Sequence, residues 1–176
     1  MTKQGSNSGA PKLSRRSVVR SAATLAATAG LASTAAAQSG AGGKPNLRFV
    51  QPETIFKTTT YTHVVEVTGP GRLIYTSGEQ GRDRDGNFPA DITAQSIQAF
   101  ENIKAALAAV GATFDHVVKL NVYMIDLRKH QPIFSEIKQR YVNKSAPPAS
   151  TTVQVPLLTR EGALVEVEAV AALPAA

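Results

Sequence analysis

The residue types that most often carry chemistry are sparse in this chain. It contains no cysteine, so thiol catalysis and thiolate metal sites are excluded. Its three histidines lie in different predicted elements and lack the spacing of metal ligands: His63, His116 and His130. We therefore expect no metal site.

The remaining polar candidates lie at two places. Ser77 and Gly78 follow a short apolar run, and Arg82 and Arg84 occupy the polar loop after them. Glu166 lies in the alternating segment LVEVEAV near the C-terminus. Each position also has an ordinary interpretation, namely a strand end, solvated loop charges and a solvated strand face.

The first 37 residues have the pattern of an export signal. A basic region containing the pair Arg15-Arg16 precedes an alanine-rich apolar stretch, and Ala35 to Ala37 supply small residues for cleavage. A twin-arginine pair of this kind directs bacterial proteins to the Tat pathway, so we expect a periplasmic protein. The apolar stretch is too short for a stable membrane anchor, which needs ~20 residues. The alternative is a basic tail followed by an alanine-rich helix.

Removing this segment changes the charge of the chain. The net charge of +6 includes five cations that precede Gln38, which leaves fourteen basic and thirteen acidic residues in the mature part. A basic patch for nucleic acid is therefore not expected. Residues 38–53 are rich in glycine, serine and proline and predict a flexible linker. Residues 54–176 suit one domain.

The hydrophobic pattern of this domain predicts the order β-β-α-β-α-β-β. The first two strands would form a hairpin, Asp91 would cap the first helix and Gly111 would end it, and Asp126 would cap the second. Two helices on one face of a mostly antiparallel sheet give an α+β fold. The predicted elements are strands 58–67 and 73–76, helix 91–110, strand 117–124, helix 128–141, and strands 150–155 and 164–170.

The second face of this sheet would be polar. On two strands, polar side chains alternate with apolar ones that lie under the helices: Lys119, Asn121, Tyr123, Glu166 and Glu168. Such a face is either solvated or pressed against another subunit.

Several separated segments together resemble the RidA/YjgF family of reactive-intermediate deaminases. They are residues 73–78 (LIYTSG), parts of 91–104, residues 115–127 and the closing 165–171 (VEVEAVA). The resemblance spans roughly residues 54–174. It implies a chorismate-mutase-like fold and a homotrimer with three clefts between subunits. It also implies hydrolysis of 2-imino acids or enamines to 2-keto acids and ammonia, without a metal or cofactor.

The resemblance also implies site residues. Tyr61, Ser77 and Gly78 fall on substrate-binding positions, and Glu166 falls on the glutamate that activates water. The family's carboxylate-binding arginine falls on Ser150.

A family asparagine in the second helix falls on Phe134. Arg82 or Arg84 could supply the charge that Ser150 lacks, although solvated loop charges are the alternative.

Two functions follow from this pattern. The first is a cofactor-free imine or enamine hydrolase with an altered substrate, because Ser150 cannot replace a guanidinium. The second is a non-enzymatic trimer that binds a small metabolite in the cleft between subunits. RNA cleavage, reported for some family members, is disfavoured by export and by the nearly neutral mature chain.

Overall fold

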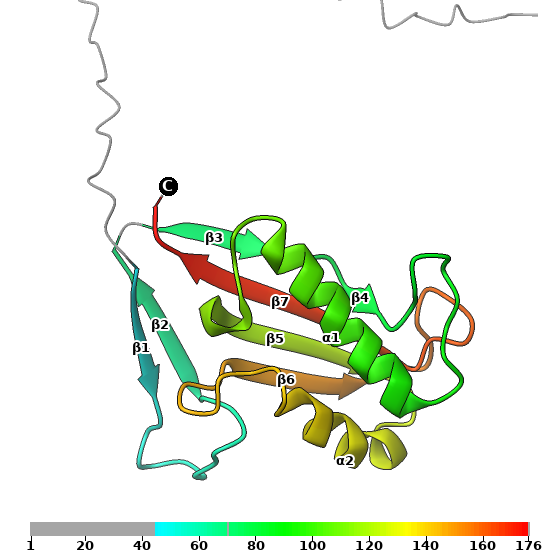
Figure 1. Cartoon of the computed structure of the whole chain (residues 1–176). Coiled ribbons are helices and arrows are strands. Elements are labelled where there is room, and N and C mark those ends of the chain that lie inside the picture. The colour runs from blue at the N-terminus through cyan, green and yellow to red at the C-terminus, as the bar shows by residue number, and fades with distance from the viewer. Residues whose placement is uncertain (1–44, 70, 176) are drawn as a thin grey trace, which may run out of the picture. The chain divides into compact units, whose positions relative to one another are not determined.

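The computed structural model describes residues 45–69 and 71–175 (Figure 1). The predicted signal sequence, residues 1–37, lies outside the described residues, as do residues 38–44 of the predicted linker. Among the described residues, neither long helix has the length and apolar character needed to cross a lipid bilayer.

The main sheet has five strands, and two helices pack on one of its faces (Figure 1). Its order is β3 (Arg72–Tyr75), β7 (Val165–Leu173), β5 (Val117–Met124) and β6 (Ala149–Gln154), and the short β4 (Glu79–Gln80) also pairs with β7. β5 and β6 are parallel, whereas the other pairs of this sheet are antiparallel. The covering helices are α1 (Ile92–Ala108) and α2 (Leu127–Lys138). The predicted α+β class is confirmed.

Helix α1 has the predicted N-cap, and it ends at Ala108, two residues before the predicted end. The Asp91 carboxylate accepts a hydrogen bond from Ala94 N at 3.0 Å, which satisfies one free amide of the first turn. Gly111 adopts a positive φ of 76° just after the helix, which glycine does without steric cost. Between these ends Phe100 and Ile103 are fully buried against the sheet.

Helix α2 has a different N-cap from the one predicted. Asp126 has a left-handed φ of 48°, and its side chain caps no amide. Instead, Gln154 at the end of β6 accepts a hydrogen bond from Leu127 N at 3.0 Å. The cap is a long-range contact between strand and helix, so local spacing could not reveal it. The helix also ends at Lys138, three residues before the predicted end.

The N-terminal part of the domain differs from the prediction in two ways. Residues Asn46–Val50 form β1 inside the segment predicted as linker, and they pair antiparallel with β2 (Val64–Thr68). The predicted hairpin between the first two strands is wrong, because β2 pairs with β1 and the following β3 pairs with β7. The β-branched run from residue 58 to 63 lies in the loop between β1 and β2.

The alternation on β5 and β7 gives the sheet two different faces. Leu120 and Val167 are buried under the helices, whereas Asn121 and Glu168 project to the other side. We call this uncovered side the open face. It also carries large exposed apolar side chains, with Tyr75 71% and Leu73 52% exposed on β3.

A short 3-10 helix, η1 (Phe114–His116), connects α1 to β5. The loop after β4 and the loop between β6 and β7 lie at one end of the sheet, and the β1–β2 pair lies toward the opposite end (Figure 1). The loops therefore form two groups, one toward each end of the main sheet.

Candidate functional site

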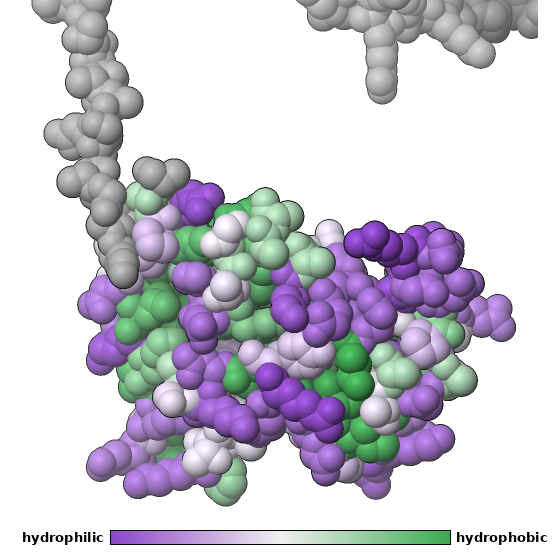
Figure 2. Space-filling model, viewed as in Figure 1, coloured by the Kyte–Doolittle hydropathy of each residue, from purple (hydrophilic) through white to green (hydrophobic). Residues whose placement is uncertain are grey.

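A polar pocket of about 410 Å³ lies at the end of the sheet where the loop after β4 meets the loop between β6 and β7. Hydrophilic residues gather on the surface at this end of the molecule (Figure 2). The pocket brings together residues that are up to 88 positions apart in the sequence. Its lining consists of Gly78, Gln80, Arg82, Thr159, Arg160 and Glu166.

Gln80 fixes the carboxylate of Glu166. The two residues are register partners on β4 and β7, and Gln80 Nε2 donates to Glu166 Oε2 at 2.7 Å. The same nitrogen donates to Thr159 Oγ1 at 2.8 Å. Because Gln80 is only 5% exposed, both amide protons are committed inside the protein. The carboxylate therefore has one oxygen held and the other directed toward Gly78.

Gly78 leaves the space that this second oxygen occupies. A Cβ built on Gly78 would lie 2.1 Å from Glu166 Oε1 and 2.7 Å from Glu166 Cδ. The chain here passes between β3 and β4, and the Thr76 hydroxyl accepts a hydrogen bond from Ala169 N at 2.9 Å. Ser77 is exposed beside Gly78 but does not line the pocket. Of the predicted pair Ser77-Gly78, only Gly78 therefore lines the pocket.

Gln95 of α1 holds the two loops together. Its side-chain nitrogen donates to Pro89 O at 2.9 Å and to Gly162 O at 2.8 Å, and its oxygen accepts from Leu164 N at 2.8 Å. Gly81 packs so closely that an added Cβ would lie 2.2 Å from the Gln95 carbonyl oxygen. Gln95 is 1% exposed and occupies a position of α1 that fits the apolar pattern. Its buried side-chain amide is nevertheless satisfied by the three hydrogen bonds given above.

Charges of both signs meet at the pocket. Burial raises the pKa of Glu79, Glu166 raises it further, and the nearby Arg82 opposes both effects. On the open face beyond the pocket, Glu168 raises the pKa of Tyr123, with which it shares a long hydrogen bond of 3.5 Å.

Two predicted site residues lie elsewhere in the chain. Tyr61 belongs to the β1–β2 loop, where its carbonyl accepts a hydrogen bond from Gln51 Nε2 at 2.8 Å. The next residue, Thr62, donates its backbone amide to Pro148 O at 3.2 Å, which ties this loop to the start of β6 and so to the neighbourhood of Ser150. The structure therefore brings Gly78, Arg82 and Glu166 together, and it places Tyr61 and Ser150 in a second group.

Ser150 also differs from Glu166 in the direction of its side chain. It is the register partner of Leu120, which is fully buried under the helices. Its own hydroxyl is buried and has no hydrogen-bond partner among the residues that the structure describes. Glu166 is the register partner of Tyr123, on the open face. The two side chains thus belong to opposite faces of the sheet.

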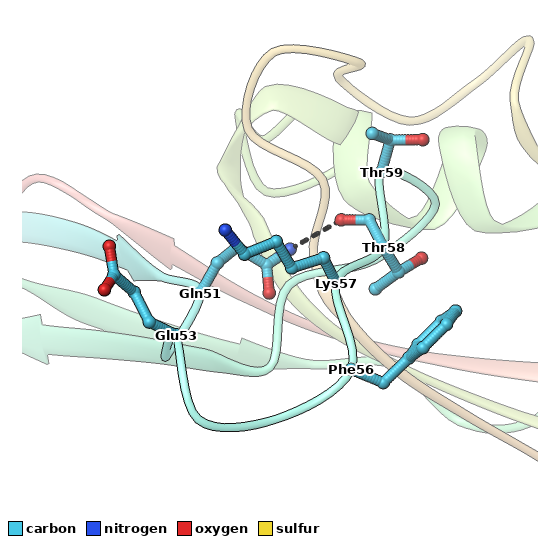
Figure 3. A pocket seen from close by; sticks show the side chains of 6 residues that line it. All are labelled: Gln51, Glu53, Phe56, Lys57, Thr58 and Thr59. Atoms are coloured by element: carbon cyan, nitrogen blue, oxygen red, sulfur yellow. Dashed lines mark hydrogen bonds between the residues drawn. The ribbon is translucent and has the colours of Figure 1, made fainter.

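A second hollow, of about 600 Å³, lies within the β1–β2 loop (Figure 3). Gln51 bridges the loop by donating to Thr58 O at 3.0 Å, while the ring of Phe56 points away from Gln51 and Glu53. None of the predicted site residues lines it.

Three lining residues were missed by the sequence analysis: Gln80, Thr159 and Arg160. β4 has only two residues, too few for a periodic pattern, and its register opposite Glu166 is a long-range feature. Thr159 and Arg160 lie in a loop that carries no motif. The one available signal was chemical, because Arg160 is a cation in a loop that leads directly into the glutamate-bearing strand.

This α+β fold holds a carboxylate in a small polar pocket at its strand ends. Residues 53–173 match the family model described as Endoribonuclease L-PSP. The chain therefore belongs to this family.

The relatives and solved structures carry related names. The chain is 37% identical over 118 residues to "Protein DfrA" of Myxococcus xanthus, covering 63% of this chain and 83% of that protein. It is 31% identical to a 2-iminobutanoate/2-iminopropanoate deaminase of Escherichia coli, covering 57% and 80%. The crystal structure of the Rid family protein YyfB from Yersinia pestis superposes with a TM-score of 0.64 at 29% identity, covering 73% of this chain and 99% of that one. The resemblance to the RidA/YjgF family is confirmed.

The contact between Gly78 and Glu166 can be tested by a double-mutant cycle. Gly78→Ala must displace the carboxylate and break its bond to Gln80, so we expect a loss of about 1–2 kcal/mol in the free energy of unfolding. In a Glu166→Ala background the same change should cost clearly less, measured by denaturant unfolding.

Gly81→Ala is the matched control for this cycle. It collides with the Gln95 backbone, so its cost should be the same in both backgrounds. Equal costs of Gly78→Ala in the two backgrounds would contradict the geometry of the site.

Proposed function

We propose that this protein is a cofactor-free hydrolase of small imines or enamines in which Glu166 is the general base. The observation that carries the proposal is the carboxylate of Glu166, held on one oxygen by Gln80 while its other oxygen lies over Gly78 in a polar pocket. The name of the Escherichia coli relative, a 2-iminobutanoate/2-iminopropanoate deaminase, supports the same reaction class.

The chemistry needs little beyond an oriented carboxylate. Glu166 accepts a proton from water as the water oxygen bonds to the imine carbon, and it returns a proton to the nitrogen. Glu166 then passes the hydroxyl proton of this tetrahedral adduct to the nitrogen, the C–N bond breaks, and ammonia leaves as the hydroxyl oxygen becomes a carbonyl group. Gln80 keeps the base in one orientation throughout, so little reorganisation is needed at the moment of reaction.

The site in this proposal lacks the arginine that the family resemblance implies as the carboxylate anchor on β6, so either the substrate or the group that binds its carboxylate must differ. Ser150 offers neither charge nor a guanidinium fork, and its hydroxyl is buried on the helix-covered face. A non-enzymatic metabolite-binding protein is the second candidate function. The observation that favours it is this same absence of a charged group at residue 150.

The proposal includes a homotrimer with clefts between its subunits. In one protomer Tyr61 lies in the β1–β2 loop and does not line the Glu166 pocket, so a neighbouring subunit would have to bring these two residues to one ligand. The open face supports this assembly, because Tyr75 and Leu73 would otherwise remain exposed to solvent. Val153, 40% exposed on β6, adds to the same face.

Glu166→Gln should lower the rate of hydrolysis by about 100-fold or more, because general-base catalysis contributes 10²–10⁴-fold and an amide cannot accept the proton. The assay generates an imine in situ and follows ammonia release. Glu161→Gln, in the adjacent loop but outside the pocket lining, is the control and should retain the parent rate. A parent protein no faster than buffer would refute catalysis, and one that still bound the keto-acid product would support the binding alternative.

The trimer predicts a solution mass about three times that of the mature chain in light scattering. Tyr75→Asp should shift the protein toward monomer, because it places a charge in the proposed interface. The control is Ile133→Asp, an apolar residue 38% exposed on α2, which covers the other face of the sheet. A monomeric parent at micromolar concentration would remove the quaternary proposal.

Export through the Tat pathway remains part of the proposal, supported by Arg15-Arg16 and the alanine-rich segment that follows. Replacing both arginines with lysine should leave the protein in the cytoplasm, as fractionation and immunoblotting would detect. Arg20→Lys, which makes the same chemical change outside the pair, should be exported like the parent. Normal export of the double mutant would show that the signal is wrongly identified.

A further inference from the structure

Two arginines line the polar pocket from different loops. Arg82 follows β4, and Arg160 lies between β6 and β7. Both are exposed, and neither forms an ion pair within the part of the chain that the structure describes. An exposed guanidinium is ordinary by itself, but two that flank the same held carboxylate form a distinct arrangement of charge.

The backbones that present these arginines are fixed to α1. Arg82 O accepts a hydrogen bond from Asn102 Nδ2 at 3.0 Å, and Arg82 N donates to Gln80 O at 2.9 Å. On the other loop, Gly162 O accepts from Gln95, two residues after Arg160. Side chains that extend from anchored backbone lose less conformational freedom when they bind a ligand.

Arg160 is anchored from two further directions. The residue before it, Thr159, accepts a hydrogen bond from the same Gln80 nitrogen that donates to Glu166. The carbonyl of Arg160 accepts a hydrogen bond from Ala163 N at 3.3 Å, which closes the turn. The position of Arg160 is therefore coupled to that of the Glu166 carboxylate through one amide group.

Residues 150 and 134, where the family resemblance implies an arginine and an asparagine, supply no charged or polar group to this pocket. The hydroxyl of Ser150 is buried on the helix-covered face. Phe134 is fully buried in the core and stacks on Phe100 at 5.5 Å between ring centroids. An anionic ligand that approaches Glu166 must therefore find its positive charge elsewhere.

We infer that Arg160, assisted by Arg82, binds the carboxylate of the ligand that occupies the Glu166 pocket. A small carboxylate is the ligand class, because a planar guanidinium matches a planar carboxylate and two cations offset the repulsion from Glu166. Arg160 is the principal anchor, since its neighbour Thr159 shares the Gln80 amide with Glu166. Only the identification of this ligand with a substrate rests on the proposed function, because binding itself does not require turnover.

The test compares two ligands of nearly equal shape in ligand-observed NMR titrations of the whole protein. Pyruvate carries the carboxylate, and pyruvamide replaces it with a neutral amide. Arg160→Ala should weaken pyruvate binding by about tenfold or more, in keeping with a charge-assisted pair, and should leave pyruvamide binding unchanged. Arg160→Lys should fall between the parent and Arg160→Ala, because lysine retains the charge without the fork.

Arg84→Ala is the matched control. Arg84 lies in the same loop as Arg82 and carries the same charge, but it does not line the pocket, so its loss should leave both affinities unchanged. Arg82→Ala should weaken pyruvate binding less than Arg160→Ala does. Thermal unfolding of each variant confirms that the fold is retained.

The outcomes separate this inference from the proposed function. Parent-like pyruvate binding by Arg160→Ala, equal losses for the two ligands, or no pyruvate binding by the parent would overturn the inference. If pyruvate binds through Arg160 but no imine is hydrolysed, the inference stands and the proposed function fails. If hydrolysis depends on Glu166 but pyruvate binding does not depend on Arg160, the proposed function stands and the inference fails.

Discussion

The side-chain amide of Gln80 is the interaction on which the candidate site depends. Gln80 is 5% exposed, and its side-chain nitrogen orients the Glu166 carboxylate and at the same time fixes Thr159 in the facing loop. A carboxylate on an alternating strand would otherwise turn freely toward solvent. By joining β4, β7 and the β6–β7 loop, this amide converts a surface glutamate into an oriented base beside a defined pocket.

Buried glutamines recur as the polar framework behind this pocket. Gln95 is 1% exposed and satisfies two carbonyls and one amide of loops that cannot bond to the sheet. An unsatisfied group in such a place would cost about 1–3 kcal/mol, so the complete bonding of Gln95 stabilises the loops as well as positioning them. Two glycines complete the framework. A side chain at Gly78 would occupy the space of the Glu166 carboxylate, and one at Gly81 would collide with the Gln95 backbone.

Regular periodicity made much of the fold predictable. α1 and its Asp91 cap, the alternation of β5 and β7, and the α+β class all follow from local sequence. The partner of β2, the existence of β1 and β4, and the capping of Leu127 by Gln154 depend on long-range pairing, which local patterns do not encode. The family resemblance implied Glu166 and Gly78, and the loop charges suggested Arg82. Gln80, Thr159 and Arg160 were missed because their place in the pocket depends on long-range pairing. Ser150 illustrates a further limit, because residue identity alone does not reveal which face of a sheet a side chain occupies.

The central claim is that the pocket of Gln80, Arg160 and Glu166 is the place where this protein binds a small carboxylate. A crystal structure of the protein soaked with pyruvate tests it most directly. The account predicts density for the carboxylate against the Arg160 guanidinium, with the carbonyl carbon beside the free oxygen of Glu166 above Gly78. Density confined to the hollow of the β1–β2 loop, or to the group around Tyr61 and Ser150 with the Glu166 pocket unoccupied, would contradict the account.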